Sequence, residues 1–269
     1  MKPNLNLTII GAGTMGETLA SRLISTETIQ TGNLKISDPN EKRISLFRDQ
    51  YGIRGGSDNA EAVTGADIVI LCTKPQNAEE VIASFRDQLG EQTLVISIMA
   101  GVRIEKLERF LQKEVPVIRA MPNTPCQVGA GMTVLAAGSH TTGNHLKTAR
   151  TLFDAVGETE ILDEKHFDAV TGLSASSPAF IYVIIEALAE GGVKCGLPRD
   201  ASTRLVAQAC LGAATMVGKN GKHPAVLKDD VTTPAGCTVD GLLKLEEGGL
   251  RVTLIKAVTE AAKRAGELG

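Results

Sequence analysis

The chain has 269 residues, a length that suits two domains of ordinary size. Hydrophobic residues make up 43% and charged residues 22%, so a wholly disordered chain is excluded. The net charge is −3 without a run of lysine or arginine, and the chain has six phenylalanines, two tyrosines and no tryptophan, which argues against a nucleic-acid-binding surface.

Cysteine usage indicates a reducing compartment, which we expect to be the cytoplasm. The five cysteines are dispersed, with no CxxC pair, and together with the four histidines they show no zinc-ligand spacing, so we expect no disulfide framework and no metal site. The N-terminus lacks a signal-peptide pattern. An uncharged apolar stretch of about 18 residues, which a membrane span requires, is also missing, so we expect no membrane association.

The first part of the chain alternates short β-branched segments with longer helical patterns. Strands are expected at 5–10, 34–37, 67–72, 93–98, 115–119, 132–136 and 159–161, and helices at 14–25, 41–51, 76–90, 103–112 and 143–156. Strands that are apolar throughout are buried on both faces, so this order predicts an α/β fold with a Rossmann-type, doubly wound and mostly parallel sheet.

The second part of the chain shows only helical patterns, at 178–194, 199–218, 236–247 and 249–266. We therefore expect a dinucleotide-binding Rossmann domain over residues 1–162 and an all-helical domain over residues 163–269. Small residues along these helices and few surface charges favour a shared helical interface in a homodimer, with a tightly packed monomer as the alternative.

Residues 11–16 form a GxGxxG motif directly after the first strand and at the start of a helix. Gly11 allows a tight turn, Gly13 lets the backbone approach a pyrophosphate, and Gly16 lets the helix pack on the strand. The helix N-terminus adds unpaired N–H groups for phosphate. The motif predicts dinucleotide binding by Ile10, Gly11, Ala12, Gly13, Thr14, Met15 and Gly16.

The end of the second strand carries opposing signals about the cofactor. Asp38 would hold a ribose 2′-hydroxyl and repel a 2′-phosphate, which favours NADH. The neighbouring Ser37, Asn40, Lys42 and Arg43 could instead neutralise that phosphate, with Asp38 acting as the N-cap of the next helix. Both interpretations stay open, with NADPH slightly favoured.

Other loops follow strands at the same predicted edge of the sheet. Lys74-Pro75, Met99-Ala100-Gly101 and Asn123 each lie just beyond a strand, where ligands bind in doubly wound sheets. In the helical part, the loop ending at Gly236-Cys237-Thr238 precedes a helix, and its backbone N–H groups would suit a carboxylate.

Several longer segments carry a resemblance to a known family. They read GAGTMG, CTKPQ, ISIMAGV, RAMPNTP, DAVTGLSASSPAF, EALAEGGVKCGLPRDAS and VTTPAGCTVDGLLKLEEGGLR. The chain resembles the pyrroline-5-carboxylate reductase family over nearly its whole length. RAMPNTP and TPAGCT are far more specific than GxGxxG, and the order and spacing of the segments fit.

The resemblance implies a fold, a reaction and a set of site residues. It implies a helical domain that interlocks with a partner's in a homodimer, often assembled into decamers, and reduction of the C=N bond of 1-pyrroline-5-carboxylate by NADPH or NADH to give L-proline, the last step of proline biosynthesis. Beyond residues 10–16, the implied cofactor contacts are Ser37, Asp38, Asn59, Cys72, Thr73, Lys74, Pro75, Met99, Ala100, Gly101 and Asn123. The implied substrate residues are Thr233, Gly236, Cys237 and Thr238, and the Thr238 hydroxyl is the candidate catalytic proton donor.

This chain departs from the family pattern at a few positions. The usual GLSGSGPAY is GLSASSPAF at residues 172–180, so two glycines have gained side chains and a tyrosine has lost its hydroxyl. The usual SPGGTT is TPAGCT, with Ala235 in place of a glycine, and an asparagine often seen before that loop is Asp230. These changes bear on substrate range more than on the class of reaction.

Two other functions fit parts of the sequence. A two-domain hydroxyacid dehydrogenase would use a helix-borne lysine as base, and Lys165 and Lys194 are available, but the surrounding hydroxyacid motifs are missing. A dinucleotide-binding sensor without turnover would account for the altered segment at 172–180. Retention of Thr238 and the carboxylate loop favours the reductase, because reducing a protonated imine needs little acid–base apparatus beyond the cofactor.

Overall fold

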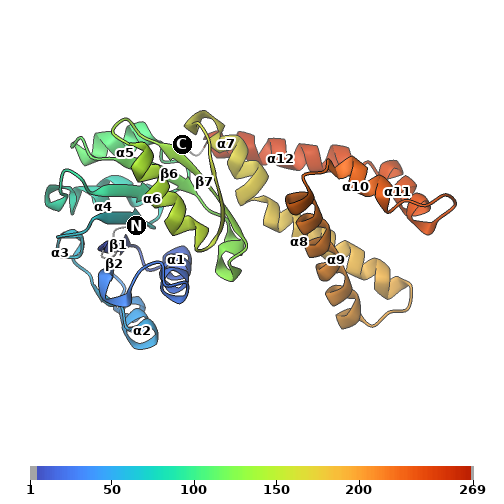
Figure 1. Ribbon diagram of the computed structural model, residues 1–269, viewed down its shortest axis with the longest axis horizontal. Coiled ribbons are helices and arrows are strands. Elements are labelled where there is room, and N and C mark those ends of the chain that lie inside the picture. Colours follow the sequence, from blue (N-terminus) through green and yellow to red (C-terminus); the bar gives the residue numbers. More distant parts are fainter. Residues whose placement is uncertain (1–4, 268–269) are drawn as a thin grey trace. The chain divides into compact units, whose positions relative to one another are not determined.

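A computed structural model describes residues 5–267 and divides the chain into two compact units (Figure 1). The first comprises Met1–Ala175 with Ala261–Gly269, and the second comprises Ser176–Glu260.

An eight-stranded sheet with the strand order β3-β2-β1-β4-β5-β6-β7-β8 lies at the centre of the first unit. The neighbouring strands are parallel except for β6 and β7, which are antiparallel. Because β1 lies between β2 and β4, the strand order reverses beside β1, which is where such sheets bind ligands. The strands are β1 Leu7–Ile10, β2 Leu34–Ser37, β3 Arg54–Gly56, β4 Ile68–Leu71, β5 Leu94–Ser97, β6 Val117–Met121, β7 Gly131–Ala137 and β8 Gly157–Ile161.

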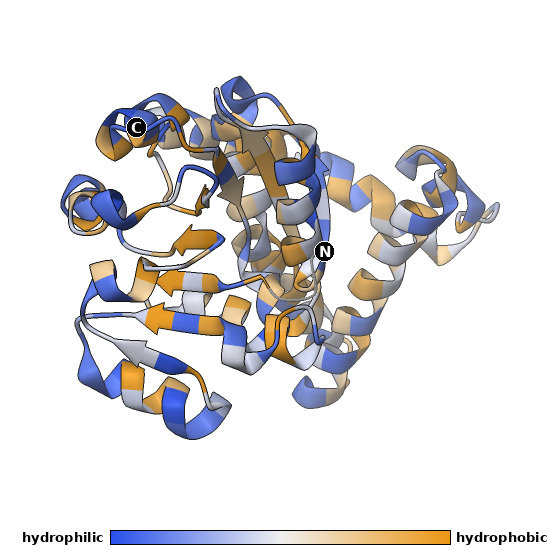
Figure 2. Cartoon of the chain, turned by 60° about the vertical axis from the view of Figure 1, so that its left-hand side comes forward, coloured by the Kyte–Doolittle hydropathy of each residue, from blue (hydrophilic) through white to orange (hydrophobic). Residues whose placement is uncertain are grey.

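Burial explains why the central strands were readable from sequence. Every residue of β1, β4, β5 and β6 is buried, and hydrophobic residues run along the strands in Figure 2. The predicted mostly parallel Rossmann-type sheet is therefore confirmed. Strand β3 was not predicted, because its sequence Arg-Gly-Gly has no apolar side chain and it only extends the edge of the sheet beside β2.

Helices cover the sheet between successive strands (Figure 1). They are α1 Thr14–Ser25, α2 Glu41–Tyr51, α3 Asn59–Val63, α4 Ala78–Ala83, α5 Ile104–Leu111 and α6 Gly143–Asp154, and a further helix, α7 Phe167–Val170, follows the last strand β8. The helix predicted at 76–90 is shorter in the structure. The Ser84 hydroxyl donates to the Val81 carbonyl oxygen at 2.6 Å and competes with helix continuation, so α4 ends and a 3₁₀ turn follows at Arg86–Gln88.

The second unit is helical, as predicted. Its helices are α8 Ser177–Lys194, α9 Arg199–Asn220, α10 Pro224–Asp230, α11 Cys237–Glu247 and α12 Leu250–Glu267, of which α12 continues into the first unit. Helix α10 was not predicted; it is short, and His223 and Pro224 start it as cap and first residue. Helices α8 and α9 form a hairpin in which Gly192 is needed, because a Cβ there would lie 2.8 Å from the Ser202 hydroxyl.

The compact units divide at a different place from the predicted domains. Phe167 and Val170 are buried against Ile104, Met121 and Val134, so the segment after residue 162 packs with the sheet. Compactness places the division between Ala175 and Ser176, and the boundary at 162/163 stays a prediction about the domains.

The helices of the second unit expose many large apolar side chains. Those more than half exposed are Tyr182, Val183, Leu205, Leu211, Val231, Leu243, Val252 and Ile255. One helical run, Glu164–Lys194, is long and apolar enough to cross a membrane by length and composition, and 11% of its most apolar window is buried. A single run of this kind also occurs in helices of soluble proteins, so the absence of a membrane span stays a prediction.

Candidate functional site

The turn between β1 and α1 has the shape that its glycines predict. Gly11 has φ +101°, and a Cβ on it would lie 2.7 Å from the carbonyl oxygen of Cys72. A Cβ on Gly16 would overlap the Gly11 carbonyl oxygen. Both positions therefore require glycine for the close packing of the chain on itself.

Gly13 differs from the other two glycines because it faces open space. A Cβ there would meet no protein atom within 4 Å, and φ is an ordinary −71°. Gly13 is the N-cap of α1, and no side chain caps that helix. The positive end of the helix is thus left open beside an uncovered backbone, which fits a dinucleotide pyrophosphate.

The peptide groups of Ala12 are held by two charged side chains from the segment after β2. Asp38 Oδ2 accepts the Ala12 N–H at 2.8 Å, and Arg43 Nε donates to the Ala12 carbonyl oxygen at 2.5 Å. Asp38 Oδ1 also accepts the N–H of Asn40 at 2.9 Å. The N-cap of α2 is Asn40, which accepts the Lys42 N–H, so the alternative that Asp38 caps this helix is wrong.

Arg43 belongs to a network that joins α2 to α1. Its terminal nitrogen pairs with Glu17, whose other oxygen accepts the Tyr51 hydroxyl at 3.0 Å. The guanidinium also lies 5.7 Å from the centre of the Phe47 ring. Arg43 is therefore fixed in place by several contacts.

Ser37 and Asn59 are hydrogen-bonded to each other at the carboxyl end of β2, and their contact with the cofactor stays a prediction. The buried Ser37 hydroxyl donates to Asn59 Oδ1 at 2.6 Å, and Asn59 Nδ2 donates to the Ser84 hydroxyl at 2.9 Å. These bonds orient the Asn59 amide.

The loops after β4 and β5 reach the same edge of the sheet. The Cys72 N–H donates to the Ile10 carbonyl oxygen at 2.7 Å, and the Thr73 hydroxyl lies 3.4 Å from the Met99 sulfur. Burial raises the pKa of the Cys72 thiol, so this group stays neutral. The other predicted residues of these loops are the exposed Lys74 and Ala100, the half-buried Pro75, and Gly101 with φ +76°.

Asn123 is engaged on both sides of its amide by protein backbone. Its Oδ1 accepts the Met132 N–H at 2.9 Å, and its Nδ2 donates to the Ser174 carbonyl oxygen at 3.2 Å. These bonds join the loop after β6 to β7 and to the π-helical turn Thr171–Ala175. Its predicted contact with the cofactor stays a prediction.

The predicted substrate residues lie together in the second unit, at the start of α11. Gly236 is the N-cap, no side chain caps the helix, and a Cβ on Gly236 would overlap the Thr233 hydroxyl. The first-turn N–H groups of Cys237 and Thr238 thus form an electropositive end that can receive a carboxylate. Ala235 has a left-handed φ of +58°, at the position where the family usually has glycine.

Sequence reasoning missed an ion pair between β6 and the segment before α7, in which the arginine is buried and the glutamate is partly exposed. Arg119 on β6 is 3% exposed, donates to Glu164 Oε1 at 2.9 Å, and lies over the Phe167 ring. The same Glu164 oxygen accepts the Ile104 N–H that starts α5. The only available signal was an arginine within an otherwise apolar strand.

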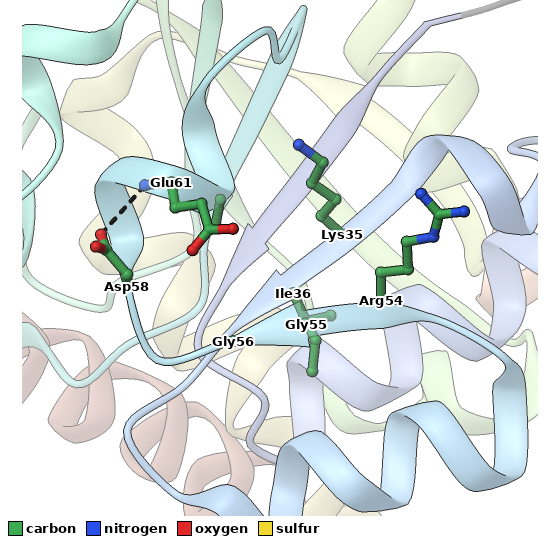
Figure 3. A pocket seen from close by; sticks show the side chains of 8 residues that line it. Lys35, Ile36, Arg54, Gly55, Gly56, Asp58 and Glu61 are labelled. Atoms are coloured by element: carbon green, nitrogen blue, oxygen red, sulfur yellow. Dashed lines mark hydrogen bonds between the residues drawn. The ribbon is translucent and has the colours of Figure 1, made fainter.

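A hollow lies beside the edge strand β3, and Figure 3 shows the residues that line it. Its volume is about 320 Å³. Lys35 and Arg54 come from β2 and β3, and Asp58 and Glu61 lie at the start of α3. None of the predicted cofactor residues lines this hollow.

The fold and these loops define a class of protein. The open glycine turn on a Rossmann sheet, followed by a helical unit with an uncapped anion-receiving helix, is the arrangement of a two-domain dinucleotide-dependent oxidoreductase. Residues 6–101 match the family model described as NADP oxidoreductase coenzyme F420-dependent, and residues 164–268 match pyrroline-5-carboxylate reductase dimerisation.

Individual relatives narrow the class to one family. The chain is 42% identical to a pyrroline-5-carboxylate reductase of Arabidopsis thaliana, over 96% of this chain and 94% of that protein. It is similar to the structure of a pyrroline-5-carboxylate reductase from Coxiella burnetii, with a TM-score of 0.93, 33% identity and 99% of both chains covered. The Plasmodium falciparum enzyme, crystallised with NADP bound, gives a TM-score of 0.88 at 32% identity, again over 99% of both chains. The chain belongs to the pyrroline-5-carboxylate reductase family.

Proposed function

We propose that the protein reduces the C=N bond of 1-pyrroline-5-carboxylate with NADPH or NADH and releases L-proline, the last step of proline biosynthesis. The observation that carries this function is the family match across both the glycine turn and the α11 loop. The open space at Gly13 and the uncapped start of α11 supply the two anion-receiving ends that a dinucleotide and a carboxylate substrate require.

The cofactor is proposed to lie along the carboxyl edge of the sheet. The turn at residues 10–16 would hold the pyrophosphate, and Ser37 with Asn59 would contact the adenosine end. The nicotinamide supplies the hydride when bound. The remaining proposed contacts are Cys72, Thr73, Lys74, Pro75, Met99, Ala100, Gly101 and Asn123.

The substrate is proposed to bind through its carboxylate at the start of α11. The N–H groups near Gly236 and Cys237 would hold that carboxylate with help from the Thr233 hydroxyl, and this contact fixes the ring. The Thr238 hydroxyl would lie near the imine nitrogen. Because a hydroxyl is a weak acid, we expect it to orient the nitrogen or pass on a proton from water.

The assembly follows from the helical domain. The dimerisation match over residues 164–268 makes the protein a homo-oligomer. We propose that residues 163–269 form the domain, that the unit is a homodimer that can assemble further into a decamer, and that the exposed apolar side chains of α8, α9 and α12 are covered there. The five free cysteines support a cytoplasmic location. We propose no membrane or nucleic-acid partner.

This function is tested by a variant of Thr238 that should affect turnover of the substrate and leave binding of the cofactor unchanged. Replacing Thr238→Ala should lower turnover of 1-pyrroline-5-carboxylate by about 10²-fold, the size expected for a group that acts on a proton in the transition state. The dissociation constant for NADPH should stay unchanged in a fluorescence titration. Thr238→Ser, which keeps the hydroxyl, should retain most of the activity. An equal loss of NADPH binding would contradict the substrate-side role.

A further inference from the structure

We propose that Asp38 and Arg43 are positioning residues that clamp the Ala12 peptide and thereby set the affinity for both dinucleotides, and that neither side chain reads the 2′ position that distinguishes NADPH from NADH. The inference rests on the proposed function, because it concerns the cofactor half of the same site.

The clamp holds the middle of the glycine turn. Ala12 lies between Gly11 and Gly13 and is completely buried. Its N–H is bound by the Asp38 carboxylate and its carbonyl oxygen by the Arg43 guanidinium. Hydrogen bonds to charged groups are stronger than neutral ones, so the orientation of this peptide depends on both side chains.

The two side chains are themselves committed to other protein groups. The second oxygen of Asp38 accepts the Asn40 N–H, and Arg43 pairs with Glu17 while packing on Phe47. A ribose hydroxyl would have to share Asp38 with two backbone N–H groups. A 2′-phosphate would share the Arg43 guanidinium with Glu17, whose negative charge would repel it. Asp38 and Arg43 therefore hold the glycine turn in place, although their positions in the sequence suggest that they distinguish NADPH from NADH.

A clamp on the turn and a direct contact with the 2′ position predict different results for the ratio of the NADPH and NADH dissociation constants. The pyrophosphate is common to NADPH and NADH, so loosening the turn weakens both by the same factor. If Asp38 repelled a 2′-phosphate, its removal would favour NADPH. If Arg43 attracted that phosphate, its removal would favour NADH.

The experiment measures dissociation constants for NADPH and NADH by fluorescence titration of the full chain. Asp38→Ala and Arg43→Met should each weaken both nucleotides by roughly tenfold or more, the loss expected for a hydrogen bond to a charged group, and leave their ratio unchanged. Asp38→Asn retains an acceptor oxygen without the charge, and it should keep more affinity than Asp38→Ala for both nucleotides. Asp163→Ala is the matched control. That carboxylate accepts the Lys165 N–H in a turn remote in sequence, so its removal should leave both constants unchanged.

A variant that changes the affinity for one nucleotide much more than for the other would overturn the proposal. A ratio that moves more than about threefold towards NADPH in both Asp38 variants, or towards NADH in Arg43→Met, would show that these side chains read the 2′ position. Unchanged affinities in Asp38→Ala and Arg43→Met would overturn it equally. If Asp38→Ala does not fold, Asp38→Asn decides by the same ratio. Failure of the unaltered protein to bind either nucleotide would overturn the proposed function and the clamp with it, whereas a selective shift on top of normal binding would overturn the clamp alone.

Discussion

Gly13 and Gly16 have different surroundings in the turn after β1, although both are glycines of the same motif. A side chain on Gly16 would collide with the Gly11 carbonyl oxygen, so this glycine belongs to the fold. A side chain on Gly13 would project into space that holds no protein atom within 4 Å, and we predict that the cofactor pyrophosphate occupies this space. The motif predicts both roles from the local strand–turn–helix geometry; the structure confirms the close packing at Gly16, and the ligand contact at Gly13 stays a prediction.

Replacing Gly13→Val should therefore leave the protein folded and remove dinucleotide binding. We expect the affinity for NADPH to fall by at least about a hundredfold, or ~2.7 kcal/mol, because the isopropyl group would occupy the pyrophosphate position. Fluorescence titration measures the affinity, and far-UV circular dichroism confirms the fold. Gly16→Val is the matched comparison and should fail to fold. Unchanged NADPH affinity in Gly13→Val would rule out this binding mode.

Ala235 is one of three described non-glycine residues with a left-handed φ, together with Glu27 and Gln112, and it lies in the loop before α11. Its φ of +58° lies in the left-handed region, which costs an L-residue roughly 1–2 kcal/mol. The family pattern has glycine here. A sequence comparison could register the substitution but could not give its cost, which depends on the backbone angle.

Replacing Ala235→Gly should stabilise the protein. Part of the relieved strain, about 0.4–1 kcal/mol, is lost to the greater freedom of glycine in the unfolded chain, so we expect a net gain of about 0.5–1 kcal/mol in the free energy of unfolding. Urea titration measures this difference. Ala213→Gly, at an exposed position within α9, should instead destabilise by about 1 kcal/mol. Destabilisation by Ala235→Gly would show that the loop is not strained.

At the scale of elements, the central strands and long helices were predictable and the short ones were not. Strands β1, β4 and β5 are buried throughout and mostly apolar because helices cover both faces. Edge strand β3 and helices α3 and α10 carry no such signal. Their positions depend on neighbours: β3 on its pairing with β2, and α10 on the cap at His223.

The ion pair between β6 and the segment before α7 joins two elements through a buried arginine. Arg119 has a side chain only 4% exposed, and Glu164 is the acid that pairs with it. Glu164→Ala should lower the free energy of unfolding by about 2–3 kcal/mol, less than for a fully buried pair because Glu164 is 25% exposed. Urea titration measures the change.

Two controls separate the buried pair from a general loss of charge. Asp49→Ala removes an exposed pair with Arg48 and should change stability by no more than about 0.5 kcal/mol. The double variant Arg119→Met with Glu164→Ala should recover part of the loss, since no unpaired buried charge remains. A Glu164→Ala protein as stable as Asp49→Ala would contradict the structural role of the pair.

At the scale of the whole molecule, the sequence predicts which loops lie at one edge of the sheet, but it does not predict all the hydrogen bonds that these loops make. The loops after β1, β2, β4 and β5 lie at one edge because parallel strands end there, and the sequence order alone predicts that. The contacts of Asp38 with Ala12, and of Asn123 with Met132 and Ser174, join residues distant in sequence. Such contacts depend on tertiary packing, so residue type alone could not predict these hydrogen bonds to backbone.

The most direct test of the whole account is the oxidation of NADPH by 1-pyrroline-5-carboxylate in the presence of the purified protein, followed by the loss of reduced-nicotinamide absorbance, with NADH in parallel. The account predicts turnover with at least one nucleotide and L-proline as the product, identified by chiral chromatography. Binding of both nucleotides without any proline formed would contradict it, and would instead support a dinucleotide sensor that has kept the reductase fold.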